Sequence, residues 1–104
     1  MLKSVKIGCY SYCVEEVPQV SKTAALKGQI DHFARVIRID RDMSRCDKIE
    51  ALIHEAIHGI DEFMHLNLSE NLVGKLGVAV AMVLMDNPDL CRLAGGPESG
   101  SCDC

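Results

Sequence analysis

Residues 45–65 read RCDKIEALIHEAIHGIDEFMH, and this stretch decides the fold. Its apolar side chains recur every three or four positions, a spacing typical of a helix with one apolar face. Ser44, followed three residues later by Asp47, resembles a capping box, so the helix is predicted to begin near Arg45. The apolar face that should pack on a core comprises Ile49, Leu52, Ile53, Ala56, Ile57, Ile60, Phe63 and Met64.

Within this helix, His54, Glu55 and His58 form an H-E-x-x-H motif. Residues four apart share one face of a helix, so both imidazoles can bind one metal ion from the same side. Glu55 would stand beside the ion, where it can take a proton from the attacking water. This is the pattern of a zinc-dependent peptidase. The alternative is two surface histidines on an amphipathic helix, because a motif that fixes three residues also arises by chance.

A catalytic zinc ion usually has three protein ligands, so a third is expected downstream of the motif. The candidates are Asp61, Glu62, His65 and Glu70. His65 would lie about 10 Å along the helix axis from His58, which is too far to share an ion comfortably. Asp61 is better placed to orient a ligating imidazole. Glu70 begins the next helix and can face the histidines from an independent element, although it could instead complete a capping box with Asn67.

The segments before the motif helix are predicted to form a small sheet. Val5–Val17 is rich in β-branched and aromatic residues and is predicted as one bent strand or a hairpin, with Gly8 at the bend. Gly28–Asp31 and Arg35–Ile39 are predicted as two short strands around a turn at residues 32–34. The strand Arg35–Ile39 is expected to be the sheet edge that receives an extended substrate.

The segment after the motif helix, residues 69–85, has a helical pattern that is apolar nearly all round. Such a helix is buried in a core or in a partner, so a homodimer is possible. Gly74 and Gly77 lower its intrinsic helicity but would allow close approach of the motif helix. Pro88 ends it, and residues 88–93 could form one more turn. The sum is an α+β domain at residues 1–93, a small twisted antiparallel or mixed sheet followed by helices, with a flexible tail at 94–104.

Composition bounds the functional classes. The chain has 104 residues, of which 48% are hydrophobic, enough for one globular domain. Its formal net charge is −4 and no stripe of Lys or Arg is present, so nucleic acid is not an expected partner. The N-terminus lacks the apolar run of a signal peptide, and the longest apolar run, Leu76–Met85, is too short to span a bilayer. We expect a cytoplasmic protein without membrane contact.

The chain contains six cysteines, and reduced thiols are the expectation for a cytoplasmic protein. Cys102 and Cys104 close a Gly- and Ser-rich tail. A thiolate on such an arm could occupy the open position of a zinc ion and keep an enzyme latent. The alternative is an unstructured terminus with incidental thiols.

From about Gly28 to Pro88 the chain resembles the small gluzincin-type metallopeptidases of phages and prokaryotes, including the minigluzincins and the ImmA/IrrE-like group. The segments that carry the resemblance are Ile30-Asp31, Val36-Ile37-Arg38-Ile39, Leu52 to Asp61, Leu68-Ser69-Glu70 and Met85-Asp86-Asn87-Pro88. The resemblance implies a twisted sheet over an active-site helix and a prokaryotic or phage-infected cell. It gives zinc-ligand roles to His54, His58 and Glu70, and the general-base role to Glu55.

The leading hypothesis is therefore a zinc metalloendopeptidase that acts on a peptide or protein. A second donor for the substrate oxygen could come from Tyr10, Tyr12, His32 or His65, none of which is favoured by the sequence. Many relatives carry an acidic residue where Gly74 stands, so this chain departs from the family there. The alternative is a non-catalytic or latent protein on the same scaffold that binds a partner. Two imidazoles and a carboxylate also suit divalent metals other than zinc.

Overall fold

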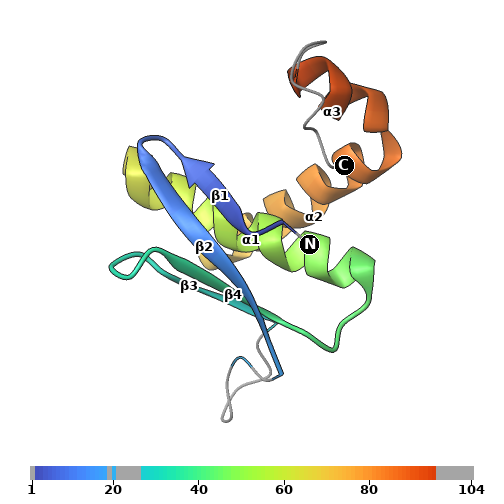
Figure 1. The fold of residues 1–104 in the computed structure, drawn as a ribbon. Helices are drawn as coiled ribbons and strands as arrows, with labels where there is room; N and C mark the ends of the chain where they lie inside the picture. Colours follow the sequence, from blue (N-terminus) through green and yellow to red (C-terminus); the bar gives the residue numbers. More distant parts are fainter. Residues whose placement is uncertain (1, 19, 21–26, 96–104) are drawn as a thin grey trace.

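The computed structural model describes residues 2–18, 20 and 27–95. The strands β1 (Ser4–Ile7), β2 (Tyr10–Val17), β3 (Gly28–Asp31) and β4 (Val36–Asp40) precede the helices α1 (Arg45–Met64), α2 (Glu70–Asp86) and α3 (Pro88–Gly95). The strands form one mixed sheet in the order β1-β2-β4-β3 (Figure 1). The predicted α+β fold, with a small sheet followed by helices, is confirmed.

The first two strands form the hairpin that was one of the two predicted alternatives. Ile7 pairs with Tyr10, so only Gly8 and Cys9 lie in the loop. Gly8 has a φ of 61°, which suits the first loop position of a type II′ turn. A Cβ atom at Gly8 would lie 2.3 Å from the ring of Phe63, which is 44% exposed and would have to move aside.

The order of the strands corrects the prediction of the sheet edge. β4 pairs with β2 in parallel and with β3 antiparallel, so the strand predicted at Arg35–Ile39 lies inside the sheet. Its side chains Ile37 and Ile39 are both 0% exposed, because the strand lies inside the sheet and α1 packs against it. The edge on this side is β3, which carries Gly28 and the exposed Gln29.

Helix α1 crosses one face of the sheet, and the core lies between them (Figure 1). The helix begins where Asp47 N donates to the Ser44 side-chain oxygen at 3.2 Å, as predicted, and ends at His65 in the left-handed conformation. The buried residues of the core cluster are Ile7, Tyr12, Ile37, Ile39, Ala51 and Leu52.

The face of α1 that meets the sheet differs from the predicted apolar arc. Ile60, Phe63 and Met64 are 39%, 44% and 60% exposed, whereas Glu55 and Gly59 are buried. The reason lies at Gly59, where a Cβ atom would stand only 2.6 Å from the Ile7 side chain. The missing side chain lets this face of the helix approach β1, which carries Glu55 toward the sheet.

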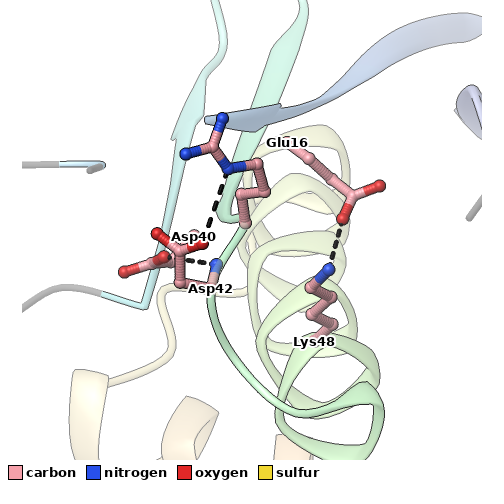
Figure 2. Close-up of polar contacts among 5 residues, drawn as sticks. Glu16, Asp40, Asp42 and Lys48 are labelled. Carbon is pink, nitrogen blue, oxygen red and sulfur yellow. Dashed lines mark hydrogen bonds and ion pairs between the residues drawn. The ribbon is translucent and has the colours of Figure 1, made fainter. Parts of the chain in front are cut away.

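Polar contacts fix the start of α1 against the sheet (Figure 2). Lys48 Nζ of α1 lies 2.6 Å from Glu16 Oε1 of β2, and this bond lowers the pKa of the Glu16 carboxyl. In the connection from β4, Asp42 N donates to Asp40 Oδ1 at 2.9 Å. The Lys48–Glu16 contact thus links the start of the motif helix to β2, and the Asp42–Asp40 contact orders the connection before it.

Helix α2 crosses α1 on the side away from the sheet (Figure 1). Within the described part of the chain, α2 packs only against α1 and α3. It approaches α1 closely at Gly77, where a Cβ atom would lie 3.3 Å from His54 Cα. The predicted close approach is therefore found at Gly77 but not at Gly74, beside which a Cβ atom would meet open space.

The cysteines fall into two groups. Cys9, Cys13 and Cys46 are exposed free thiols, as predicted, whereas Cys91 of α3 is buried and disulfide-bonded, so the prediction of reduced thiols does not hold there. Cys102 and Cys104 lie outside the described residues, as does most of the predicted tail.

The length and hydropathy of the described helices show whether any of them could span a membrane. None of the helices between residues 45 and 95 has both the length and the apolar composition needed to cross a bilayer.

Candidate metal centre

Two imidazoles of α1 and one carboxylate of α2 meet at a single point. His54 and His58 are one helical turn apart, and their ring centroids are separated by 5.0 Å. Glu70 is the first residue of α2 and holds both rings: its Oε1 lies 2.9 Å from His54 Nε2, and its Oε2 lies 2.9 Å from His58 Nε2. One ligand atom from each residue lies within 4.8 Å of the other two, so the group can bind a metal ion.

The loop between α1 and α2 delivers Glu70 to this point. His65 and Asn67 both adopt positive φ angles, 54° and 60°, which reverse the chain within a few residues. Asp61 stabilises the reversal, because its Oδ1 accepts a hydrogen bond from Leu68 N at 3.2 Å. Asp61 was expected to orient a ligating imidazole, and the contact that the structure shows for its carboxylate is with the loop that carries Glu70.

The capping alternative for Glu70 can be compared with this geometry. The N-cap of α2 is Ser69, whose side-chain oxygen accepts from Leu72 N at 3.1 Å. Asn67 is therefore not the N-cap, and the Glu70 carboxylate contacts the two histidines. The structure thus places the predicted third ligand beside the first two.

The spacing of the three side chains suits a small divalent cation. Ligands about 2.1 Å from a tetrahedral ion are separated from one another by about 3.4 Å. The observed separations of 2.9 Å are slightly shorter. The Glu70 side chain is 71% exposed and the two histidines about a quarter, so the carboxylate is free to retract and admit an ion. The donor set of two nitrogens and one carboxylate leaves a further position for water or substrate.

Glu55 is buried beside this group, with 8% of the residue exposed. Burial raises the pKa of its carboxyl, an effect that the neighbouring His54 and His58 partly oppose. The β3 backbone lies against it, because a Cβ atom on Gly28 would stand 3.3 Å from Glu55 Oε2. Glu55 is therefore held between the sheet edge and the candidate ligands. The contribution of Gly28 was not predicted from the sequence, where an isolated glycine signals only a strand end.

A cleft of about 680 Å³ brings the sheet edge and the metal centre together. One wall is formed by residues 28–30 of β3 and by His32, and the other by His54, Glu55 and Glu70. A second hollow of about 550 Å³ continues past Glu70 along α2, beside Gly74 and Val78. His54 and Glu70 line both hollows, and His58 lines the first.

The chain was compared with known protein families, curated proteins and solved structures. No family model, no curated protein and no solved structure matches the chain. The resemblance to gluzincin-type peptidases therefore remains an expectation that depends on the motif residues, and geometry supplies the evidence about function.

Proposed function

We propose that this chain is a zinc-dependent endopeptidase. One observation carries the proposal: the carboxylate of Glu70, from a separate helix, lies within 2.9 Å of both motif imidazoles. The alternative, two surface histidines on an amphipathic helix, does not require a third ligand atom from a separate helix. The buried Glu55 in the same cleft adds the group that hydrolysis requires.

The chemistry is divided between the ion and Glu55. Zinc bound by His54, His58 and Glu70 would acidify a water molecule and polarise the substrate carbonyl. Glu55 takes the proton from the attacking water and passes it to the leaving amine. The burial of Glu55 in the cleft, beside the three candidate ligands, places its carboxyl where both proton transfers would take place.

The geometry of the cleft supports an extended peptide as substrate. β3 has a neighbour on one side only and lines the cleft, so its free edge can pair with the backbone of a bound peptide. A hollow lies on either side of Glu70, which leaves room for a bound peptide to extend in both directions from the cleaved bond. This arrangement favours an internal peptide bond over a terminal one.

The metal site is tested by native mass spectrometry of the untagged protein. We expect a single zinc ion per chain in the parent and its loss in Glu70→Ala. Glu62→Ala is the matched control, because Glu62 is also an exposed glutamate but lies outside the cluster of ligand atoms. Equal zinc content in the parent and Glu70→Ala would contradict the proposed ligand set.

The catalytic role of Glu55 is tested by Glu55→Gln. The amide is nearly isosteric but cannot accept the proton, so zinc should remain while hydrolysis of fluorogenic peptides falls by roughly 10²–10⁴-fold. Unchanged hydrolysis in this variant would show that another group is the base.

A second candidate function is favoured by the surface of α2, namely a partner-binding protein in which the metal joins α1 to α2. Seven apolar side chains of α2 are 37–53% exposed: Leu72, Leu76, Val78, Val80, Met82, Val83 and Met85. If this function is the correct one, the zinc-loaded parent will hydrolyse no peptide and will be indistinguishable from Glu55→Gln.

A further inference from the structure

His32 lies in the cleft but has no part in the proposed set of metal ligands. It is the first residue after β3 and lines the same cleft as His54, Glu55 and Glu70. The residue is half-buried, and it comes from the sheet side of the cleft, opposite the helices. A polar side chain in this position faces the space that a bound peptide would occupy.

The turn that carries His32 is well ordered by hydrogen bonds. Asp31 Oδ1 accepts from Phe33 N at 3.0 Å and from Ala34 N at 2.9 Å. Arg35 closes the turn with a φ of 59°, a conformation that costs free energy for a residue other than glycine. The turn therefore holds His32 at a fixed place at the end of the edge strand.

A chain of polar contacts leads from Arg35 to the imidazole of His32. Arg35 Nη1 donates to Tyr12 Oη at 3.4 Å, and Tyr12 Oη lies 3.4 Å from His32 Nδ1. The guanidinium also lies over the Tyr10 ring, with Cζ 3.6 Å from the ring centroid. Tyr12 itself is only 2% exposed, so its hydroxyl depends on these two partners.

The direction of this chain determines which ring nitrogen carries the proton. A guanidinium can only donate, so the Tyr12 oxygen accepts from Arg35 and keeps its single proton for His32. Nδ1 of His32 is then the acceptor. In a neutral imidazole the other nitrogen, Nε2, must carry the hydrogen.

We propose that His32 donates this Nε2–H to the carbonyl oxygen of the substrate as negative charge develops on it. His32 is thus a catalytic residue, and Tyr12 and Arg35 are positioning residues that fix its tautomer. The inference rests on the proposed peptidase function. It selects among the four donors that the sequence left open, because Tyr10 lies under the guanidinium, the Tyr12 hydroxyl is committed, and His65 caps the far end of α1.

The kinetic test compares His32→Ala, His32→Gln and the control His65→Ala with the parent on a fluorogenic peptide. Loss of one such donor should lower kcat by roughly 10²–10³-fold and leave KM nearly unchanged, because the bond strengthens only in the transition state. Zinc content should stay at the parent level. The Gln side chain offers an N–H near the position of Nε2, so His32→Gln should recover part of the loss.

The positioning role is tested by nitrogen NMR of the His32 ring in the zinc-loaded parent and in Tyr12→Phe. The parent should show the Nε2–H tautomer, and Tyr12→Phe a mixture of both tautomers with a smaller loss of kcat. Binding of a phosphonamidate peptide, which mimics the tetrahedral transition state, should shift the Nε2–H proton of the parent downfield. This measurement needs no variant and remains decisive if His32→Ala does not fold.

The outcomes separate this inference from the proposed function. If the parent hydrolyses peptides and His32→Ala is equally fast, or if the parent carries its proton on Nδ1, the inference is overturned while the peptidase stands. If the zinc-loaded parent hydrolyses nothing, both are overturned. A loss of kcat in His32→Ala with partial recovery in His32→Gln supports the inference.

Discussion

Gly28 lies where the backbone of β3 comes closest to the carboxyl of Glu55. A Cβ atom there would meet Glu55 Cγ at 3.2 Å and Ile39 Cδ1 at 3.2 Å, and both neighbours would have to yield by a few tenths of an ångström. Because a small displacement of a proton-transfer group is costly, Gly28→Ala should lower kcat by about tenfold or more. Native mass spectrometry should show unchanged zinc, since the ligands are not crowded. Full activity in this variant would mean that Glu55 has more freedom than the structure indicates.

Asp31 gives a prediction about pH at the same scale. Hydrogen bonds from Ala34 N and Phe33 N lower the pKa of its carboxyl below the ordinary value. A carboxyl whose pKa is lowered in the folded state stabilises the fold at every pH above its pKa in the unfolded chain. This stability is lost as the pH falls through the folded-state pKa. Asp31→Ala should therefore melt at a lower temperature than the parent at pH 7, and the difference should narrow in strong acid, where the contribution of the charge is lost.

The matched control for this experiment is Asp31→Asn, which keeps an oxygen acceptor but cannot titrate in this range. Its melting temperature should lie below that of the parent at neutral pH and converge with it in strong acid, where both side chains offer only an uncharged oxygen acceptor. Circular dichroism melts from pH 7 to about pH 2.5 would provide the comparison, since that interval brackets the titration of aspartate. A gap between Asp31→Ala and the parent that stays constant across this interval would contradict the assigned role of the charge.

At the scale of elements, the crossing of α1 and α2 determines whether Glu70 reaches the histidines. Gly77→Ala would place a Cβ atom 3.3 Å from His54 Cα, where backbone must move instead of a flexible side chain. We expect α2 to shift, the fold to lose ~1–2 kcal/mol, and zinc affinity to fall, because Glu70 moves with its helix. Gly74→Ala is the control on the same helix, since open space surrounds it. It should stabilise the protein by ~0.5–1 kcal/mol through helix propensity.

Zinc competition titrations and chemical denaturation of the two variants would measure these effects. The prediction fails if both substitutions change zinc affinity equally, because the helix crossing would then have no special role at residue 77. An increase in stability for Gly77→Ala would likewise show that α1 and α2 are not in close contact there.

The same elements show how far sequence reasoning reaches. The bounds of α1 and the convergence on Glu70 were predictable, because helical spacing, a capping serine and a short loop are all local signals. The identity of the edge strand and the buried face of α1 could not be predicted, because both depend on contacts between segments that are distant in the sequence. The interior position of β4 follows from its pairing with β2 on one side and β3 on the other, and the rotation of α1 from one glycine at residue 59.

The chain of polar contacts from Arg35 through Tyr12 to His32 was predictable only in part. Each residue type was visible in the sequence, and His32 and Tyr12 were among the possible donors. Their connection depends on the register that places Val5 opposite Tyr12 and Cys13 opposite Val36, which brings the start of β4 beside β2. Local patterns carry no information about that register, so no preference among the donors could be predicted.

At the scale of the whole molecule, the described chain consists of two packed parts that meet at α1. The sheet and α1 share the main core, whereas α2 and α3 contact the rest only through α1. The candidate ligands come from both parts: His54 and His58 from α1, and Glu70 from α2. A bound metal ion would therefore act as a cross-link between them and stabilise the crossing of the two helices.

Removal of the metal should consequently destabilise the molecule. Zinc at a hundredfold excess over its dissociation constant stabilises the folded state by ~2.7 kcal/mol, which corresponds to a shift of roughly 10 °C or more for a domain of this size. Calorimetry should show this fall in melting temperature when a chelator is added to the parent. Glu70→Ala should melt at the same temperature with and without the chelator, whereas the control Glu62→Ala should behave like the parent. If the parent melts identically in both conditions, zinc is not bound between α1 and α2, and the three side chains form only an ion-paired cluster.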